Sequence, residues 1–163
     1  METVAIVGRP NVGKSTLFNR VIGERKSIVD DFSGVTRDRV YGESDWGGIN
    51  FNVIDTGGFV PNSDDVFETA IREQVKIAME EANVILFVVD VVTGITYLDD
   101  EIAAMLRKSD KKILLVVNKV DNHQRLLDSN EFYSLGFEQL FALSSINGSG
   151  TGELMDAIIE GMD

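Results

Sequence analysis

The chain has 163 residues, 44% of them hydrophobic and only two of them proline, which is the composition of one globular domain rather than of a disordered protein. Its formal charge of −12 argues against a protein that holds a long nucleic acid through counterion release, and the absence of cysteine excludes disulfides and thiol chemistry. No apolar run reaches the length of a membrane span and the N-terminus lacks the basic start of a signal peptide, so we expect a cytoplasmic protein without membrane contacts.

The predicted elements alternate between strands and helices. In chain order they are strand 4–7, a helix from about 14 to 22, strands 41–46 and 49–54, a helix over 67–82, strand 84–89, a helix over about 99–108, strand 113–117, strand 139–143 and a helix over 151–159. The polar segment 23–39 shows no sustained periodicity, and Gly47-Gly48 is a typical hairpin turn. This pattern predicts a single doubly wound α/β domain that binds ligands beyond the carboxyl ends of its strands.

The loop between the first strand and the first helix is Gly8-Arg9-Pro10-Asn11-Val12-Gly13-Lys14-Ser15, a Gly-x-x-x-x-Gly-Lys-Ser sequence. Its glycines allow the backbone to wrap so tightly that successive N–H groups point at phosphate oxygens. Lys14 adds a charge for the β- and γ-phosphates, and the Ser15 hydroxyl is suited to bind magnesium. The strand–loop–helix context favours a phosphate-binding loop over a chance glycine-rich turn.

Two predicted strands end in aspartate. Asp55 is followed by Thr56-Gly57-Gly58, where a glycine lets the backbone close on a terminal phosphate. In phosphate-loop enzymes the aspartate that ends a neighbouring strand holds magnesium, so we assign Asp55 to that role rather than to turn capping. We interpret Asp90, at the end of the other strand, as a loop or cap residue. Thr36 is a further hydroxyl that would reach magnesium only when the polar segment closes over a nucleotide.

The candidate base-reading element is Asn118-Lys119-Val120-Asp121, directly after strand 113–117. A carboxylate at Asp121 accepts two parallel hydrogen bonds from the N1–H and N2–H₂ edge of guanine, which adenine does not offer. Asn118 is placed to tie loops together, and the Lys119 stem to cover the base. Ser145, within Ser144-Ser145-Ile146 after the last strand, is a candidate backbone donor to the guanine O6. Together these motifs predict binding of GTP and GDP.

The motifs resemble the first, N-terminal GTPase domain of the bacterial Der (EngA) family. The resemblance covers the whole chain and includes the phosphate loop, Gly34-Val35-Thr36-Arg37-Asp38-Arg39, Ile54-Asp55-Thr56-Gly57-Gly58 and Asn118-Lys119-Val120-Asp121. It implies a P-loop NTPase of Ras-like fold, a three-layer sandwich with a mostly parallel six-stranded sheet whose second strand is antiparallel. It also implies magnesium-dependent GTP hydrolysis and a role in assembly of the large ribosomal subunit.

Der proteins also contain a second GTPase domain and a KH-like domain. The resemblance therefore implies that 1–163 is one GTPase domain excised from a longer chain, which reaches the ribosome through its other parts and binds no nucleic acid directly itself. The nucleotide-binding residues it implies are Gly8, Arg9, Pro10, Asn11, Val12, Gly13, Lys14, Ser15, Thr16, Asp55, Thr56, Gly57, Gly58, Phe59, Asn118, Lys119, Asp121, Ser144, Ser145 and Ile146. The implied magnesium ligands are Ser15, Thr36 and Asp55, and the implied catalytic residues are Lys14, Thr36, Gly58 and Asn11.

Asn11 and Phe59 point to an unusual hydrolytic site. Many GTPases place a water-orienting glutamine where this chain has Phe59, and phenylalanine cannot hydrogen-bond water. Relatives with asparagine at the Asn11 position and a hydrophobic residue at the Phe59 position are known for potassium-stimulated hydrolysis. The side-chain oxygen of Asn11 is a suitable potassium ligand, and the alternative is a hydrogen bond within its own loop.

Three functions remain open from the sequence. Lys14, Thr36 and Asp55 favour a slow GTP hydrolase, whereas Phe59 favours a guanine-nucleotide-binding regulatory module with negligible hydrolysis when isolated. A nucleoside kinase is a more distant alternative because no acceptor site is visible. We interpret Arg9, Arg37 and Arg39 as surface salt-bridge residues rather than as internal arginine fingers.

Overall fold

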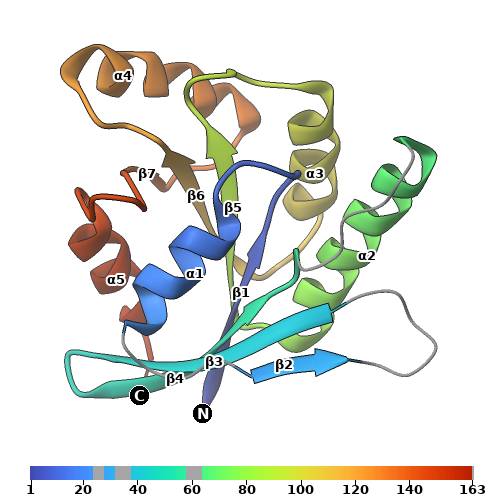
Figure 1. The fold of residues 1–163 in the computed structure, drawn as a ribbon, viewed down its shortest axis with the longest axis vertical. Coiled ribbons are helices and arrows are strands. Elements are labelled where there is room, and N and C mark those ends of the chain that lie inside the picture. The colour runs from blue at the N-terminus through green and yellow to red at the C-terminus, as the bar shows by residue number, and fades with distance from the viewer. Residues whose placement is uncertain (24–27, 32–37, 58–63, 163) are drawn as a thin grey trace.

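The structure is a computed structural model that describes residues 1–23, 28–31, 38–57 and 64–162 (Figure 1). Its strands are β1 (Glu2–Val7), β2 (Ile28–Asp31), β3 (Asp38–Trp46), β4 (Ile49–Asp55), β5 (Val84–Asp90), β6 (Lys112–Asn118) and β7 (Leu140–Ala142). Its helices are α1 (Lys14–Ile22), α2 (Asp64–Glu81), α3 (Tyr97–Arg107), α4 (His123–Asp128) and α5 (Thr151–Ile159), with a 3₁₀ helix η1 (Ser129–Leu135) after α4. Within these ranges, no helix is both long and apolar enough to cross a bilayer.

A single sheet organises the molecule, with the strand order β2-β3-β4-β1-β5-β6-β7. The strands from β4 to β7 pair in parallel, whereas β3 is antiparallel to both β2 and β4. All residues of β5 are buried, which explains why this strand is apolar without alternation up to Asp90. The register aligns Ile6 with Asp55 and Asp90 with Asn118, so the loops after β1, β4, β5 and β6 leave the sheet at one edge.

Helices cover both faces of the sheet and divide the core in two (Figure 1). On the face of α1 and α5, Leu154 shares a buried cluster with Leu86 of β5. On the face of α2 and α3, Ile102 shares a second buried cluster with Phe87. Because successive strand residues point to opposite faces, the neighbours Leu86 and Phe87 serve different clusters. The predicted three-layer α/β sandwich with a mostly parallel sheet is therefore confirmed.

The antiparallel part of the sheet both confirms and extends the predictions. The predicted hairpin is present, and Gly47 and Gly48 make its turn with φ angles of +57° and +82°. In the described part of the chain the sheet has seven strands, one more than expected, because β2 pairs antiparallel with β3. A strand of four residues is too short for a periodic pattern, and β2 lies within the segment 23–39 for which no element was predicted. The short helices α4 and η1 were not predicted either.

Candidate functional site

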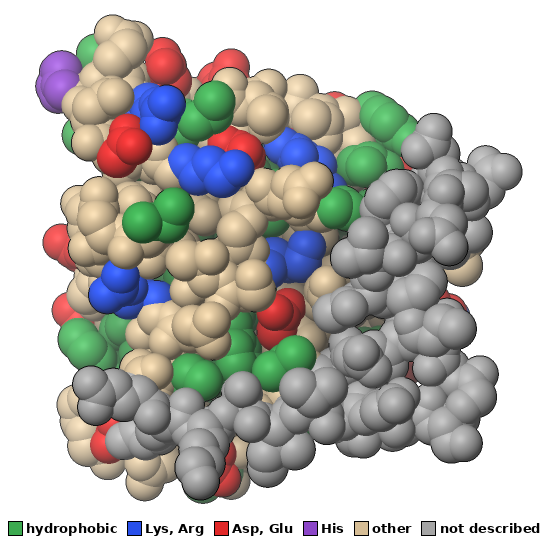
Figure 2. All heavy atoms as spheres, viewed as in Figure 1, with side chains coloured by type: hydrophobic (Ala, Val, Ile, Leu, Met, Phe, Trp, Pro, Cys, Tyr) green, Lys and Arg blue, Asp and Glu red, His purple; other side chains and the backbone are tan. Residues whose placement is uncertain are grey.

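The loops at the carboxyl edge of the sheet surround a cavity of about 620 Å³, a volume typical of small-molecule sites. Lys14, Lys119 and Arg125 bring positive charge to it, although the whole chain has a formal charge of −12. Figure 2 shows Lys and Arg side chains over the middle of the face seen in Figure 1. The residues that line the cavity are Pro10, Asn11, Gly13, Lys14, Ser15, Thr16, Asp55, Gly57, Gln74, Asn118, Lys119, Asp121, Arg125, Ser144, Ile146 and Asn147.

In the loop between β1 and α1, Gly13 occupies a position that only glycine fits. Gly13 has a φ of +97°, and a Cβ built on it would lie 2.3 Å from Asn118 Nδ2. This same Nδ2 donates to the Val12 carbonyl oxygen at 2.8 Å, while the Val12 side chain is buried in the core. The missing side chain at Gly13 therefore lets the loop after β6 close directly onto the phosphate loop.

Lys14, the first residue of α1, is buried, with 8% of its surface exposed. Its Nζ donates to the carbonyl oxygens of Gly8 at 2.7 Å and Arg9 at 2.8 Å, so the ammonium group lies over the loop. Burial lowers the pKa of Lys14 from 10.5 to about 8. The negative charge of Asp55 opposes this decrease, and the positive charge of Arg9 adds to it. A phosphate beside Lys14 would favour its charged form, so the site is suited to an anion.

The titration of Lys14 predicts a pH dependence of stability in the nucleotide-free protein. Because its folded pKa of about 8 lies below the ordinary 10.5, the folded state binds fewer protons than the unfolded state between these pH values. The free energy of unfolding therefore rises with pH between about 8 and 10.5. This gain is present above pH 10.5 and is lost as pH falls through 8. The two pKa values differ by about 2.5, which corresponds to about 3 kcal/mol.

The test compares the free energy of unfolding of the parent chain with that of Lys14→Met. We expect the parent value minus the variant value to rise by about 3 kcal/mol between neutral pH and pH 10.5. Lys14→Met keeps an apolar stem without the charge, so subtracting its values removes the titration of all other groups. Urea denaturation at a series of pH values measures both chains. A difference that stays constant with pH would contradict the prediction.

Asp55 ends β4 beside the phosphate loop and is buried. Its Oδ1 accepts a hydrogen bond from the Gly57 N–H at 3.0 Å. Burial raises the pKa of Asp55, and both the Gly57 hydrogen bond and the Lys14 charge oppose that rise. The described residues contain no group of three or more His, Asp or Glu side chains that could hold a metal by themselves. The Ser15 hydroxyl and the Asp55 carboxylate instead fit magnesium, which characteristically binds one or two carboxylates together with substrate phosphates.

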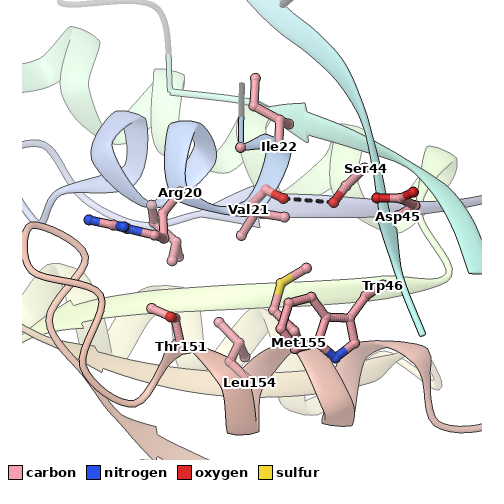
Figure 3. A pocket seen from close by; sticks show the side chains of 11 residues that line it. Arg20, Val21, Ile22, Ser44, Asp45, Trp46, Thr151, Leu154 and Met155 are labelled. Carbon is pink, nitrogen blue, oxygen red and sulfur yellow. Dashed lines mark hydrogen bonds between the residues drawn. The ribbon is translucent and has the colours of Figure 1, made fainter. Parts of the chain in front are cut away.

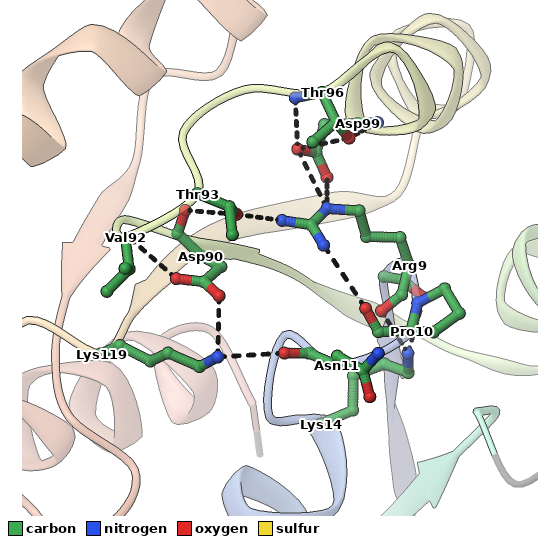
Figure 4. A network of polar contacts seen from close by, with 11 residues as sticks. Arg9, Pro10, Asn11, Lys14, Asp90, Val92, Thr93, Thr96, Asp99 and Lys119 are labelled. Carbon is green, nitrogen blue, oxygen red and sulfur yellow. Dashed lines mark hydrogen bonds and ion pairs between the residues drawn. The ribbon is translucent and has the colours of Figure 1, made fainter.

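Arg9 points toward the start of α3 (Figure 4). Its Nε lies 3.3 Å from Asp99 Oδ1, and its Nη2 donates to Thr93 Oγ1. Asp99 is fully buried and forms a capping box with Thr96. Burial raises the pKa of Asp99, against the Thr96 hydrogen bonds and the Arg9 charge. Arg9 thus makes a salt bridge as predicted, but a largely buried one that ties the phosphate loop to α3; the side chains of Arg37 and Arg39 lie outside the described residues.

Lys119 joins the base-reading loop to the phosphate loop (Figure 4). Its Nζ donates to the Asn11 carbonyl oxygen at 3.1 Å and forms an ion pair with Asp90 Oδ2 at 2.7 Å. The other oxygen of Asp90 accepts from the Val92 N–H at 2.8 Å, so Asp90 ends β5 and its side chain holds the turn that follows, which agrees with its interpretation as a loop or cap residue. Lys119 lines the cavity, and the two contacts of its Nζ, with Asn11 and with Asp90, hold its side chain there.

Asn118 connects three loops through one side chain. Besides its bond to Val12, its Oδ1 accepts from both the N–H and the hydroxyl of Ser145 at 3.0 Å. The Ser145 N–H, predicted to bind the guanine O6, therefore already has a partner within the chain, and its donation to a ligand stays a prediction. Behind this loop, Arg20 donates to the carbonyl oxygens of Ser145 at 3.1 Å and Ile146 at 2.7 Å.

Arg20 also borders a second cavity, of about 530 Å³, which lies between α1, β3 and α5 (Figure 3). This cavity contains none of the residues predicted from the sequence motifs. The chemistry that the motifs indicate belongs to the first cavity.

The structure brings most of the predicted binding residues together. The predicted residues that the structure describes but that do not line the cavity are Gly8, Arg9, Val12, Thr56 and Ser145. Thr56 is turned into the sheet, where its Oγ1 donates to the Ile6 carbonyl oxygen. Thr36, Gly58 and Phe59 lie outside the described residues. The sequence analysis missed three lining residues, Gln74, Arg125 and Asn147. Of these, only Arg125 could have been predicted from the sequence, because residues four apart on a helix lie on the same face and Arg125 follows Asp121 by four.

Known proteins share these sequence features. Residues 3–119 match the family model described as 50S ribosome-binding GTPase. The chain is 62% identical over 157 residues to GTPase Der of Flavobacterium johnsoniae, covering 96% of this chain and 36% of that protein. It is 58% identical over 159 residues to GTPase Der of Christiangramia forsetii, covering 98% of this chain and 37% of that protein. The chain thus spans little more than a third of the length of these curated relatives, and the resemblance to Der is confirmed.

Solved structures share the fold. Era in complex with MgGDPNP and a segment of 16S ribosomal RNA gives a TM-score of 0.78 at 32% identity, over 98% of this chain and 56% of that one. A variant of Era from Aquifex aeolicus bound to GDP and aluminium fluoride gives 0.77 at 30% identity, over 98% and 57%. The G domain of the FeoB iron transporter of T. maritima gives 0.74 at 27% identity, over 98% of both chains. With a family model that matches more than two thirds of its length and a Ras-like fold, the chain belongs to the 50S ribosome-binding GTPases.

Proposed function

We propose that this chain is a GTPase domain that binds GTP and GDP and hydrolyses GTP as a switch. The observation that carries the proposal is that one cavity holds both Lys14 of the phosphate loop and the Asp121 carboxylate, with Asn118 bonded to the phosphate loop between them. Lys14 would neutralise the β- and γ-phosphates, and Asp121 would accept the N1–H and N2–H₂ of guanine. Adenine would leave the Asp121 carboxylate without these donors.

Ser15 and Asp55, together with Thr36, are the residues that would hold magnesium. When bound, the ion would supply positive charge that offsets the negative charge of the nucleotide phosphates. Two observations support this assignment: the Gly57 N–H donates to the Asp55 carboxylate at 3.0 Å, and Ser15 lies in the first turn of α1. The roles of Thr36, Gly58 and Phe59 stay predictions, because these residues lie outside the described part of the chain.

The relatives extend the proposal to a cellular role. Because similar proteins are named GTPase Der and the family model is described as ribosome-binding, we propose that the longer protein acts in assembly of the large ribosomal subunit. Residues 1–163 would contribute one GTPase domain to it, and contacts with ribosomal RNA would come from other parts. A cytoplasmic location without membrane contact also stays a prediction.

Single-turnover phosphate release tests the proposal. With the protein in excess over GTP and with magnesium present, we expect GTP to bind in preference to ATP and to release phosphate, and Lys14→Ala to slow the release by about 10²–10³-fold. Tight guanine-nucleotide binding without phosphate release would instead favour the regulatory module. Equal binding of ATP would contradict the guanine site.

Asn11 leads to a prediction on monovalent cations. It lines the cavity with a φ of +69°, and its backbone oxygen is already bonded to Lys119, which leaves the side-chain oxygen as the proposed potassium ligand. A potassium ion there would stabilise charge that develops on the phosphates, a role that Arg9 does not fill while paired with Asp99.

We expect hydrolysis to be about tenfold faster in potassium than in sodium or lithium at equal ionic strength, and Asn11→Ala to lose this difference. Phosphate release measured in the three chloride salts gives the comparison. Equal rates in all three salts, or an unchanged potassium effect in Asn11→Ala, would contradict the assignment.

A further inference from the structure

Arg125, in the first turn of α4, contacts two residues of the base-reading loop. Its Nη1 donates to Asp121 Oδ1 at 2.9 Å and to the Lys119 carbonyl oxygen at 3.3 Å. Its backbone N–H donates to the side chain of Asn122, the N-cap of α4, at 2.8 Å. The guanidinium group therefore bridges the carboxylate that would read the base and the backbone that precedes it, and Arg125 itself lines the nucleotide cavity.

The contacts of the Asp121 carboxylate leave room for a ligand. Within the described part of the chain, the hydrogen bonds to this group come from Arg125 and Asn122 and fall on Oδ1. A carboxylate offers about four acceptor positions on its two oxygens, so the bonds from Arg125 and Asn122 leave Oδ2 for other donors. A ligand donor to Oδ1 would take the position of the longer Asn122 bond, at 3.4 Å. The side chain of Asp121 is 46% exposed, so without such a contact its carboxylate would be free to rotate.

Orientation matters here because guanine presents two parallel donors. Both are satisfied together only when the two carboxylate oxygens lie in the plane of the base, whereas a base with a single donor tolerates rotation. The backbone of Lys119 has a positive φ of +68°, and its carbonyl bond to Arg125 holds the turn that carries Asp121. One guanidinium group thus restrains both the turn and the carboxylate.

We propose that Arg125 is a positioning residue that determines guanine specificity by holding the Asp121 carboxylate in the orientation that accepts both donors of the base. The inference rests on the proposed function, since it concerns how the same site chooses its nucleotide. The Arg125–Asp121 pair is partly exposed, so its effect is expected in selectivity and only modestly in overall stability.

The test compares GTP with inosine triphosphate, which lacks the N2 amino group and therefore offers Asp121 only one donor. We expect Arg125→Ala to weaken GTP binding by about three- to tenfold and to weaken inosine triphosphate binding less, so that the ratio of the two dissociation constants falls toward one. Arg125→Lys, which keeps a charge and one donor, is expected to recover part of the ratio. Fluorescence titration with magnesium present measures both constants.

Gln124→Ala is the matched control, because Gln124 is the neighbouring residue of α4 and donates to Asp128 at 3.0 Å rather than to the base-reading loop. An unchanged ratio in Arg125→Ala, or the same change in Gln124→Ala, would overturn the inference and assign the effect to the helix. If the parent chain binds GTP and Arg125→Ala keeps the parent ratio of the two dissociation constants, only this inference is overturned. If the parent chain does not bind GTP, the proposed function is overturned as well.

Discussion

Asp121→Asn is expected to lower the affinity for GTP by about 10²–10⁴-fold, because two hydrogen bonds to a charged acceptor are lost or reversed. An amide in place of the carboxylate presents a donor to the base edge, where guanine also presents donors. Xanthine carries a carbonyl oxygen in place of the guanine amino group, so the same variant is expected to prefer xanthosine triphosphate. The fold is expected to stay intact, since the Asp121 side chain is 46% exposed.

Competition between GTP and xanthosine triphosphate for a fluorescent nucleotide measures this exchange. Asp128→Asn provides the matched control, because it makes the same chemical change at the end of α4, where the carboxylate accepts from Gln124. We expect this control to keep the parent preference for GTP. If Asp121→Asn bound GTP as tightly as the parent chain, Asp121 would not be the base-reading residue.

Gly13→Ala is expected to lower the free energy of unfolding by about 2–5 kcal/mol and to remove nucleotide binding. A residue with a side chain pays about 1–2 kcal/mol for the left-handed conformation that the φ of +97° requires. The new Cβ would also lie 2.3 Å from Asn118 Nδ2, and overpacking of this kind costs about 1–3 kcal/mol. Displacing Asn118 would break its bond to Val12 and separate the base-reading loop from the phosphate loop.

Gly48→Ala separates the two contributions. Gly48 has a φ of +82° in the hairpin turn, and a Cβ on it would meet no atom within 4 Å. We expect this variant to lose only the conformational part, about 1–2 kcal/mol, and to bind GTP as the parent chain does. Urea denaturation and nucleotide titration of both variants give the comparison, and equal losses would show that the contact between Gly13 and Asn118 has no energetic effect.

Local rules were enough to predict much of this molecule. The phosphate loop was predictable because two glycines, Lys14 and Ser15 act within one contiguous stretch, whatever surrounds it. The apolar strands were predictable because burial on both faces of a sheet leaves no polar alternation, and the hairpin because only certain residues adopt the φ angles of its turn. Asp121 could be proposed as a base reader from the sequence because its chemistry, a bidentate acceptor, is carried by one side chain, and that role stays a prediction.

The partners of charged side chains were decided only by the tertiary structure. Arg9 pairs with Asp99, 90 residues further along the chain, and Arg20 supports a carbonyl oxygen of Ser145, 125 residues away. These contacts exist because the order β4-β1-β5-β6-β7 brings the loops after separate strands to one edge, an order set by burial of the whole core rather than by any polar pair. Strand β2 was likewise decided by the tertiary structure, because its backbone groups hydrogen-bond with β3 and not within their own four residues. The sequence by itself determined which chemical groups the site contains, whereas the sheet determined which of them touch, because long-range polar contacts form only where packing has already placed their donors and acceptors.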